Sequence, residues 1–304
     1  MTETADRNPL PLPPPGGGLK AAFARPKWVA GACVVALTGL GWLYLGILIA
    51  GMGGTLSALG PGMSPFDYLP RVLTMVCQPT FGIALMPDGT AWGASGLILV
   101  LLMWMAMALA MMLPSAGPMI LTYAEIAETA ARKGERIVSP FVLAAGYAVV
   151  WFAFAAVASL AQFVFTRAAL LNASMASASA LFSGAIFIAA GIYQFSALKH
   201  ACLTQCRSPF PFFFTRWETK ARGVFRLGLQ QGVFCLGCCW AMMLVMFAVG
   251  VMNVVWMAAL GVVMTVEKML SGKRFTHAVG VVMIVIGVVV IGMSVAAHWP
   301  VHHV

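Results

Sequence analysis

Sulfur-bearing side chains gather in one apolar segment in the last third of the chain. The segment begins Cys235-Leu236-Gly237-Cys238-Cys239, and Met242 and Met246 follow it at helical spacing. In a helix of about 3.6 residues per turn these cysteines and methionines share one face. Thiolates and thioethers are soft ligands that favour Cu(I), and thiolates also suit zinc and iron–sulfur clusters. Cysteine and methionine are also ordinary packing residues, so packing is the alternative interpretation of the same stripe.

A second pair of cysteines, Cys202 and Cys206, lies at the end of another apolar stretch. Their spacing puts both on one face of a helix, with Lys199 near that face and His200 on the opposite side. A nearby cation favours the thiolate form that metals bind. We expect this pair to lie about 10 Å closer to the membrane surface than the Cys235 group, in the same half of the membrane. One thiolate site or two adjacent sites can form there, while two small residues at a helix end are the alternative.

The ligand types favour copper over zinc. Structural zinc usually takes four ligands, whereas Cu(I) accepts two or three soft ones. Met242 and Met246 would not serve zinc but would suit Cu(I). Cys235 and Met246 are about 16 Å apart along a helix, so one ion cannot contact both. The full stripe therefore predicts successive sites and passage of the ion rather than storage.

The composition places these residues in a membrane. The chain has 304 residues, of which 61% are hydrophobic and 9% charged, with a mean hydropathy of +0.93. A soluble domain carries much more charge, and a membrane-spanning helix needs about 20 mostly apolar residues. We predict an all-α membrane bundle of about seven transmembrane helices, at about 28–50, 97–121, 139–163, 177–198, 229–249, 251–270 and 277–297.

The basic residues predict the orientation of this bundle. Cytoplasmic loops are enriched in Lys and Arg. With the N-terminus inside and the C-terminus outside, every basic residue except Arg71 and Arg167 falls on the cytoplasmic side. The net charge of +9 then reflects orientation and contact with anionic lipid rather than nucleic-acid binding.

The regions outside the spans divide the chain into three parts. Residues 1–27 form a Pro/Gly-rich tail that cannot sustain a helix or pack a core, and we expect it to be disordered and cytoplasmic. Residues 28–297 form the transmembrane domain, which includes the external loop 51–95. Residues 298–304 form a short external tail. We expect Cys33 to be a packing residue and Cys77 to lie on the external side of the membrane. Three histidines in the last tail could capture a metal: His298, His302 and His303.

The second apolar stretch carries a methionine stripe and two prolines. Met103, Met107 and Met111 are spaced four apart, and Pro114 and Pro118 each remove a backbone donor, which frees a carbonyl one turn earlier. One interpretation is a kinked helix whose methionines only pack in the core. The alternative is that the thioethers line a path for an ion. Two carboxylates lie near predicted cytoplasmic helix ends, and we expect both to be interfacial rather than buried: Glu125 and Glu267.

Over residues 95–270 the chain resembles a bacterial family of predicted metal-binding integral membrane proteins, domain of unknown function 2182. The motifs that carry the resemblance are Met-Trp-Met with Met-Met-Leu-Pro-Ser-Ala-Gly-Pro-Met in 103–119, Tyr-Gln-Phe-Ser-Ala-Leu-Lys-His-Ala-Cys-Leu-Thr-Gln-Cys-Arg-Ser-Pro in 193–209, Gly-Val-Phe-Cys-Leu-Gly-Cys-Cys-Trp-Ala-Met-Met in 232–243 and Gly-Val-Met-Asn in 250–253. The resemblance implies a multi-pass protein of the bacterial inner membrane with a metal role. It supplies no reaction and no established ligand.

Three functions remain open. The first is a membrane protein that binds or moves Cu(I), in contact with the lipid bilayer and with a metal-delivery protein or membrane complex as partner. Its expected ligands are Cys202, Cys206, Cys235, Cys238, Cys239, Met242 and Met246. The second is a thiol–disulfide oxidoreductase using Cys235 and Cys238, which is disfavoured because cytoplasmic thiols are kept reduced. The third is a structural or assembly subunit. A non-enzymatic role is favoured. The sequence has no ATP-binding motif, so active pumping would need an ion gradient or another subunit.

Overall fold

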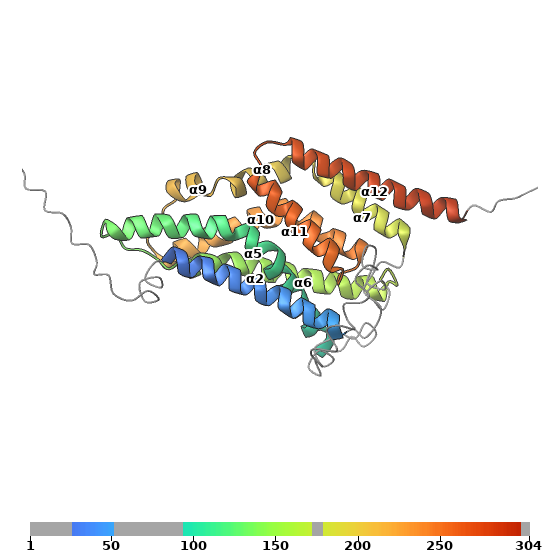
Figure 1. The fold of residues 1–304 in the computed structure, drawn as a ribbon, viewed down its shortest axis with the longest axis horizontal. Helices are drawn as coiled ribbons and strands as arrows, with labels where there is room; N and C mark the ends of the chain where they lie inside the picture. The colour runs from blue at the N-terminus through green and yellow to red at the C-terminus, as the bar shows by residue number, and fades with distance from the viewer. Residues whose placement is uncertain (1–25, 52–93, 172–178, 299–304) are drawn as a thin grey trace, which may run out of the picture.

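The computed structural model describes residues 26–51, 94–171 and 179–298, and every regular element among them is a helix (Figure 1). The all-α fold is therefore confirmed. In chain order the helices are α2 (Pro26–Gly51), α5 (Ala94–Arg132), α6 (Pro140–Arg167), α7 (Ala180–Tyr193), α8 (Ala197–Arg207), α9 (Pro209–Thr215), α10 (Ala221–Val249), α11 (Val254–Met269) and α12 (Arg274–His298).

Several of these helices are long and apolar enough to cross a membrane. Within the described residues, α2, α5, α6, α10 and α12 each meet that requirement alone. Helices α7 and α8 meet it together, but they are bent by 65° at a short break. Helix α11 has 16 residues, so it is about 24 Å long and shorter than a usual span. The multi-pass membrane bundle is thus confirmed, while the count of seven spans and the orientation stay predictions.

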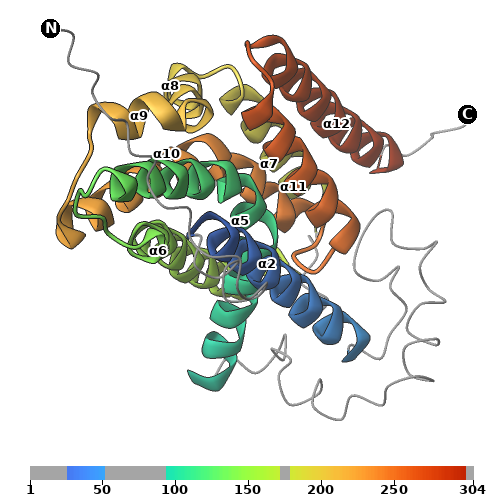
Figure 2. The same ribbon diagram turned by 60° about the vertical axis from the view of Figure 1, so that its left-hand side comes forward.

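Helix α5 is longer than the sequence predicted. It runs for 39 residues through Pro114 and Pro118 to Arg132, and not only to residue 121. Figures 1 and 2 show it bending between its first and last turns, as expected where proline removes backbone hydrogen bonds. The last turns carry Glu128, which forms an ion pair with Arg132, and Glu125, which forms an ion pair with Lys27 of α2.

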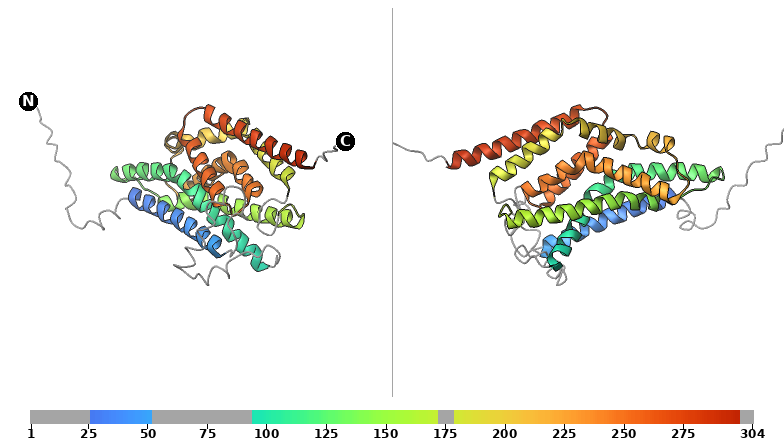
Figure 3. Two further views of the ribbon diagram at one scale, coloured as in Figure 1. Left: turned by 45° about the vertical axis from the view of Figure 1, so that its right-hand side comes forward. Right: turned by 180° about the vertical axis from the view of Figure 1, so that it is seen from behind.

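Helix α10 forms the centre of the bundle. Of the residues in the most apolar part of α10, 67% are buried, whereas the corresponding share in α12 is 17%. It packs against α6, α7, α8 and α11, while α2 covers α5 and α12 covers α7. The view from behind in Figure 3 shows α10 between α6 on one side and α7 with α12 on the other. The sulfur stripe of the sequence therefore lies in the protein interior and does not face lipid.

Two connections that carry basic residues, the one between α5 and α6 and the one before α10, lie at one end of the bundle. In Figure 1, α2, α6 and α10 begin on the left and α5 ends there, whereas α12 ends on the right. The connections next to Arg132 and Lys220 therefore lie at the same end. This grouping is what the predicted charge separation requires, whichever side of the membrane that end faces.

Glycines let α6 and α10 approach closely. A Cβ on Gly228 would lie 3.2 Å from the Cα of Gly146 and 3.0 Å from the carbonyl carbon of Leu143. Gly228 and Gly232 form a Gly-x-x-x-Gly pattern, which permits close helix contact in membranes. This contact matters for the interior because it sets α6 directly against the helix that carries the cysteines.

We predict that Gly228→Ala lowers the free energy of unfolding by about 1–3 kcal/mol, because the new methyl group has no space against the α6 backbone. Gly46→Ala is the matched control: a Cβ at Gly46 meets nothing within 4 Å, and alanine favours the helix by up to about 1 kcal/mol. Thermal unfolding in detergent distinguishes the two. Equal melting temperatures for both variants would contradict the close packing.

Candidate metal centre

Four cysteines from two helices form a buried group, hereafter the cysteine cluster: Cys206 of α8 and Cys235, Cys238 and Cys239 of α10. The sulfur of Cys238 lies 3.9 Å from that of Cys206 and 3.3 Å from that of Cys239. The three cysteines of α10 are at most 3% exposed, whereas Cys206 is half-buried. All four are free thiols. The structure thus brings most of the predicted thiol ligands together around Cys238.

The break between α7 and α8 makes this contact possible. Helix α7 ends at Tyr193 and α8 begins at Ala197, capped by the side chain of Ser196, which accepts a hydrogen bond of 3.1 Å from the backbone N–H of Lys199. The 65° bend turns α8 against α10. A straight helix would have kept Cys206 well above the level of the α10 cysteines. The bend brings it into contact with Cys238.

The remaining predicted ligands lie outside this cluster. The sulfur of Cys202 packs over Gly237, so closely that a Cβ there would lie 2.5 Å from it. Met242 and Met246 continue along α10 as predicted and are at most 1% exposed. They belong to a core that holds many further methionines, among them Met103, Met107 and Met111. That these thioethers line an interior path for the ion stays a prediction.

Cys235 is the cysteine with the most polar surroundings. The Lys268 ammonium donates a hydrogen bond of 3.0 Å to its sulfur and one of 2.7 Å to the Ser115 hydroxyl. The Tyr147 hydroxyl lies 3.1 Å from the same sulfur. A cavity of about 10 Å³ opens beside these groups and is also lined by Cys206, which is space for about one water-sized species. A positive charge and a hydroxyl therefore surround a sulfur at a small internal cavity.

A buried ion pair lies behind the cluster. The Lys199 ammonium lies 2.8 Å from a carboxylate oxygen of Glu267 and donates a 3.0 Å hydrogen bond to the carbonyl of Cys238. The side chains of Lys199 and Glu267 are 0% and 1% exposed. The expectation that Glu267 is interfacial is therefore wrong, because it neutralises a lysine inside the bundle. Glu125, with its side chain 52% exposed, matches the interfacial prediction.

His200 points away from the cysteine cluster. Helix α8 stays regular to Arg207, so His200 faces α12, where its Nε2 lies 3.2 Å from Nε2 of His277. Other predicted elements cannot be compared with the structure: Cys77, His302, His303, most of the 1–27 tail and most of the 51–95 loop lie outside the described residues. The backbone of His298 ends α12.

The cluster as it stands is not a complete metal cage. Among residues 26–51, 94–171 and 179–298, no group of three or more His, Cys, Asp or Glu has the arrangement needed to hold a metal ion. Metal–sulfur bonds of about 2.3 Å, as in zinc thiolates, hold two ligand sulfurs about 3.8–4.6 Å apart as the angle opens from tetrahedral to linear. The Cys206–Cys238 separation of 3.9 Å falls in that range. The separation of these two sulfurs therefore permits both to contact one metal ion, at an angle nearer to tetrahedral than to linear.

Sequence reasoning missed the polar groups around the cluster. Lys268 and Glu267 end an apolar stretch, which is the usual pattern of surface charges. Tyr147 lies on α6, far along the sequence, and no spacing rule links it to Cys235. Helical spacing places Lys199 near the Cys202 face, but it gives no sign that Lys199 pairs with Glu267. The signal that could have indicated the Lys199–Glu267 pair is the presence of a basic and an acidic residue in two separate apolar stretches.

Comparison with family models places the chain in a described family. A model of PpoB2, described as copper chaperone, matches residues 101–290. This range includes all the cysteines of the cluster as well as Lys199, Glu267 and Lys268. Comparison with curated proteins and with solved structures finds no match.

We predict that Glu267→Gln destabilises the protein by about 3–5 kcal/mol, because it leaves the ammonium of Lys199 buried without its counter-charge. Glu125→Gln removes a half-exposed ion pair and should cost at most about 1 kcal/mol. The free energy of unfolding of the two variants in detergent, compared with wild type, tests this. A Glu267→Gln variant as stable as Glu125→Gln would mean that the buried pair contributes nothing.

Proposed function

The chain belongs to the PpoB2 family of copper chaperones, and on that premise we propose that it binds Cu(I) as cargo through thiolates of the cysteine cluster. The observation that carries the proposal is the contact between Cys206 of α8 and Cys238 of α10, 3.9 Å apart. Two soft sulfurs on separate helices form a pair that suits Cu(I). Because each sulfur belongs to its own helix, a small relative movement of α8 and α10 would alter the pair and release the ion.

The exposure of the cysteines supports a direction of loading. Cys206 is half-buried at the end of α8, whereas Cys238 and Cys239 are 1% exposed. An ion arriving from a metal-delivery protein would meet Cys206 first. The ion would exchange one sulfur ligand for the next, from Cys206 to Cys238 and then to Cys239. It would move inward in this way and keep at least one sulfur ligand throughout. Met242 and Met246 then offer thioethers further along α10, which is why passage is proposed rather than storage.

Lys268 acts as a positioning residue in this proposal. Two thiolates and one Cu(I) together carry a single negative charge, which is costly in an apolar interior unless a cation compensates it. The ammonium of Lys268 lies 3.0 Å from the sulfur of Cys235 and is held in place by Ser115. It therefore supplies positive charge next to the cysteine cluster, beside the small cavity that Cys206 and Cys235 line, without being a ligand itself.

The thiol–disulfide alternative has less support. The family is described by copper and not by redox chemistry. A purely structural role would not account for a cation and a hydroxyl directed at one buried sulfur. We propose the bacterial inner membrane as the location, with the lipid bilayer around the bundle and a metal-delivery protein as partner.

We predict that Cys238→Ser abolishes Cu(I) binding, because it removes the sulfur that lies next to those of both Cys206 and Cys239. The substitution changes little volume, so the fold should persist. Anaerobic titration of the reduced protein against a coloured Cu(I) chelator measures the affinity, and Cys33→Ser, on α2, is the matched control that should bind as wild type does. The proposal is wrong if reduced wild-type protein binds no Cu(I), or if Cys238→Ser binds it equally well.

Removing the positive charge beside Cys235 should weaken binding without removing a ligand. We expect Lys268→Met to lower Cu(I) affinity about 10–100-fold, the usual effect of losing a group that supports metal ligands. Lys268→Arg should restore most of the affinity, since it keeps the charge. Lys273→Met, at an exposed lysine in the connection that follows α11, is the control. Equal affinities for the Lys268→Met and Lys273→Met variants would remove Lys268 from the proposal.

A further inference from the structure

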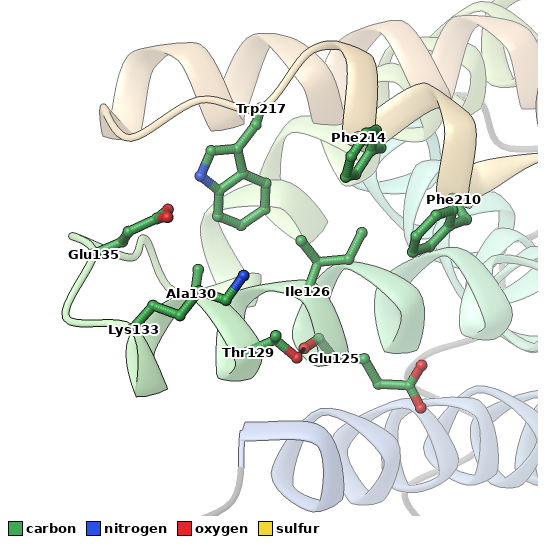
Figure 4. Close-up of a pocket in the computed structure, with 9 residues that line it drawn as sticks. All are labelled: Glu125, Ile126, Thr129, Ala130, Lys133, Glu135, Phe210, Phe214 and Trp217. Atoms are coloured by element: carbon green, nitrogen blue, oxygen red, sulfur yellow. Dashed lines mark hydrogen bonds between the residues drawn. The ribbon is translucent and has the colours of Figure 1, made fainter. Parts of the chain in front are cut away.

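A groove of about 500 Å³ lies at the end of α5, apart from the cysteine cluster. Figure 4 shows its two sides: the last turns of α5 form one wall, and aromatic side chains from α9 and the segment after it form the other. The residues that matter for recognition are Glu125, Ile126, Phe210, Phe214, Trp217 and Glu135.

The aromatic wall is open and firmly held. Phe210 and Phe214 are 56% and 71% exposed, and their rings stack at 5.8 Å. Trp217 stacks at 5.6 Å on Tyr123, which is fully buried and fixes its orientation. The indole nitrogen of Trp217 is itself buried, so Trp217 offers the face of its ring rather than a hydrogen-bond donor. Flat aromatic surfaces are what proline-rich segments dock against, because these segments are extended before they bind and lose little entropy on docking.

Two carboxylates line the groove. Glu125 lines it from α5, and Glu135 is exposed at its far end, with Lys133 as the one lysine of the lining. Lys27, the second residue of α2, already forms an ion pair with Glu125. The described part of the chain therefore begins at the edge of the groove.

The chain itself contains a segment that fits. Residues 9–15 read Pro-Leu-Pro-Leu-Pro-Pro-Pro, and three glycines follow at 16–18. Arg7 precedes this run, and Lys20 and Arg25 follow it. The stretch between Pro15 and Lys27 can extend to about 40 Å, so the run can reach any part of a groove that Lys27 already contacts.

We propose that the proline-rich run 9–15 of this chain docks in the groove formed by α5, α9 and Trp217. The prolines and leucines pack on Phe210, Phe214 and Trp217, and Arg7 pairs with a groove carboxylate. Because the run is tethered next to the groove, its effective concentration there is in the millimolar range. Even weak contacts then keep the groove occupied by its own chain. This inference is independent of copper binding.

Photocrosslinking in the full-length protein in nanodiscs tests the proposal. A benzophenone amino acid replaces Leu12, and the crosslinked peptides are identified by mass spectrometry. We expect crosslinks within residues 125–135 or 210–217 of the same molecule. If the run is docked about 90% of the time and the substitution weakens docking about 100-fold, the yield should fall about tenfold. Phe214→Ala and Trp217→Ala are the test variants, and Phe152→Ala, an exposed phenylalanine of α6, is the control that should change nothing.

The other possible occupants give distinct results. Crosslinks to lipid would show that the groove takes headgroups or acyl chains, and crosslinks between two copies would show an intermolecular contact. Either result would overturn the proposal, as would yields that do not differ between Phe214→Ala and Phe152→Ala. Excess synthetic peptide of residues 5–18 should lower the wild-type yield. Because Phe214 is mostly exposed, its alanine variant keeps the fold, which the elution profile and melting temperature check.

Discussion

A lysine ammonium inside a membrane protein must find an anion and hydrogen-bond acceptors, and here that requirement joins three helices. Lys199 comes from α8, its carboxylate partner Glu267 from α11, and the carbonyl that it also contacts from Cys238 of α10. An isolated buried charge would cost several kcal/mol, so none of the three helices can shift without that penalty. The position of Cys206 opposite Cys238 depends on this junction, because both lie on the helices that Lys199 connects.

The two internal lysines have different surroundings. Lys199 is matched by a carboxylate and is electrically balanced. Lys268 donates to a hydroxyl and to a sulfur, so among these described contacts its positive charge faces a thiol. A bound Cu(I) held by two thiolates would supply the complementary negative charge. The first pair thus stabilises the helix arrangement, and the second cation is the one whose position suits a metal cargo.

Helix α5, which runs beyond the end that the sequence predicted, contributes to two separate regions of the tertiary structure. The turns of α5 around Ser115 face Cys235 and Lys268, whereas the turns around Glu125 and Ile126 face Phe210 and Trp217. One long, bent helix therefore contributes to the interior cavity and to the surface groove. The bend at Pro114 and Pro118 lies between the first half of the helix and the half that carries the groove.

The sequence by itself determined the membrane class, the helical fold and most of the cysteine cluster. Composition forces the apolar stretches into helices that satisfy their own backbone hydrogen bonds in lipid, and the helical period is enough to place Cys235, Cys238 and Cys239 on one buried face. The contact of Cys206 with Cys238, the Lys199–Glu267 pair and the approach of Lys268 and Tyr147 to Cys235 were decided only by tertiary structure. They depend on the 65° break between α7 and α8 and on how α6, α10 and α11 pack. Helical periodicity describes one helix at a time, so it cannot predict which faces of different helices meet. For that reason the sequence indicated Glu267 as a surface charge, although its side chain is buried inside the bundle.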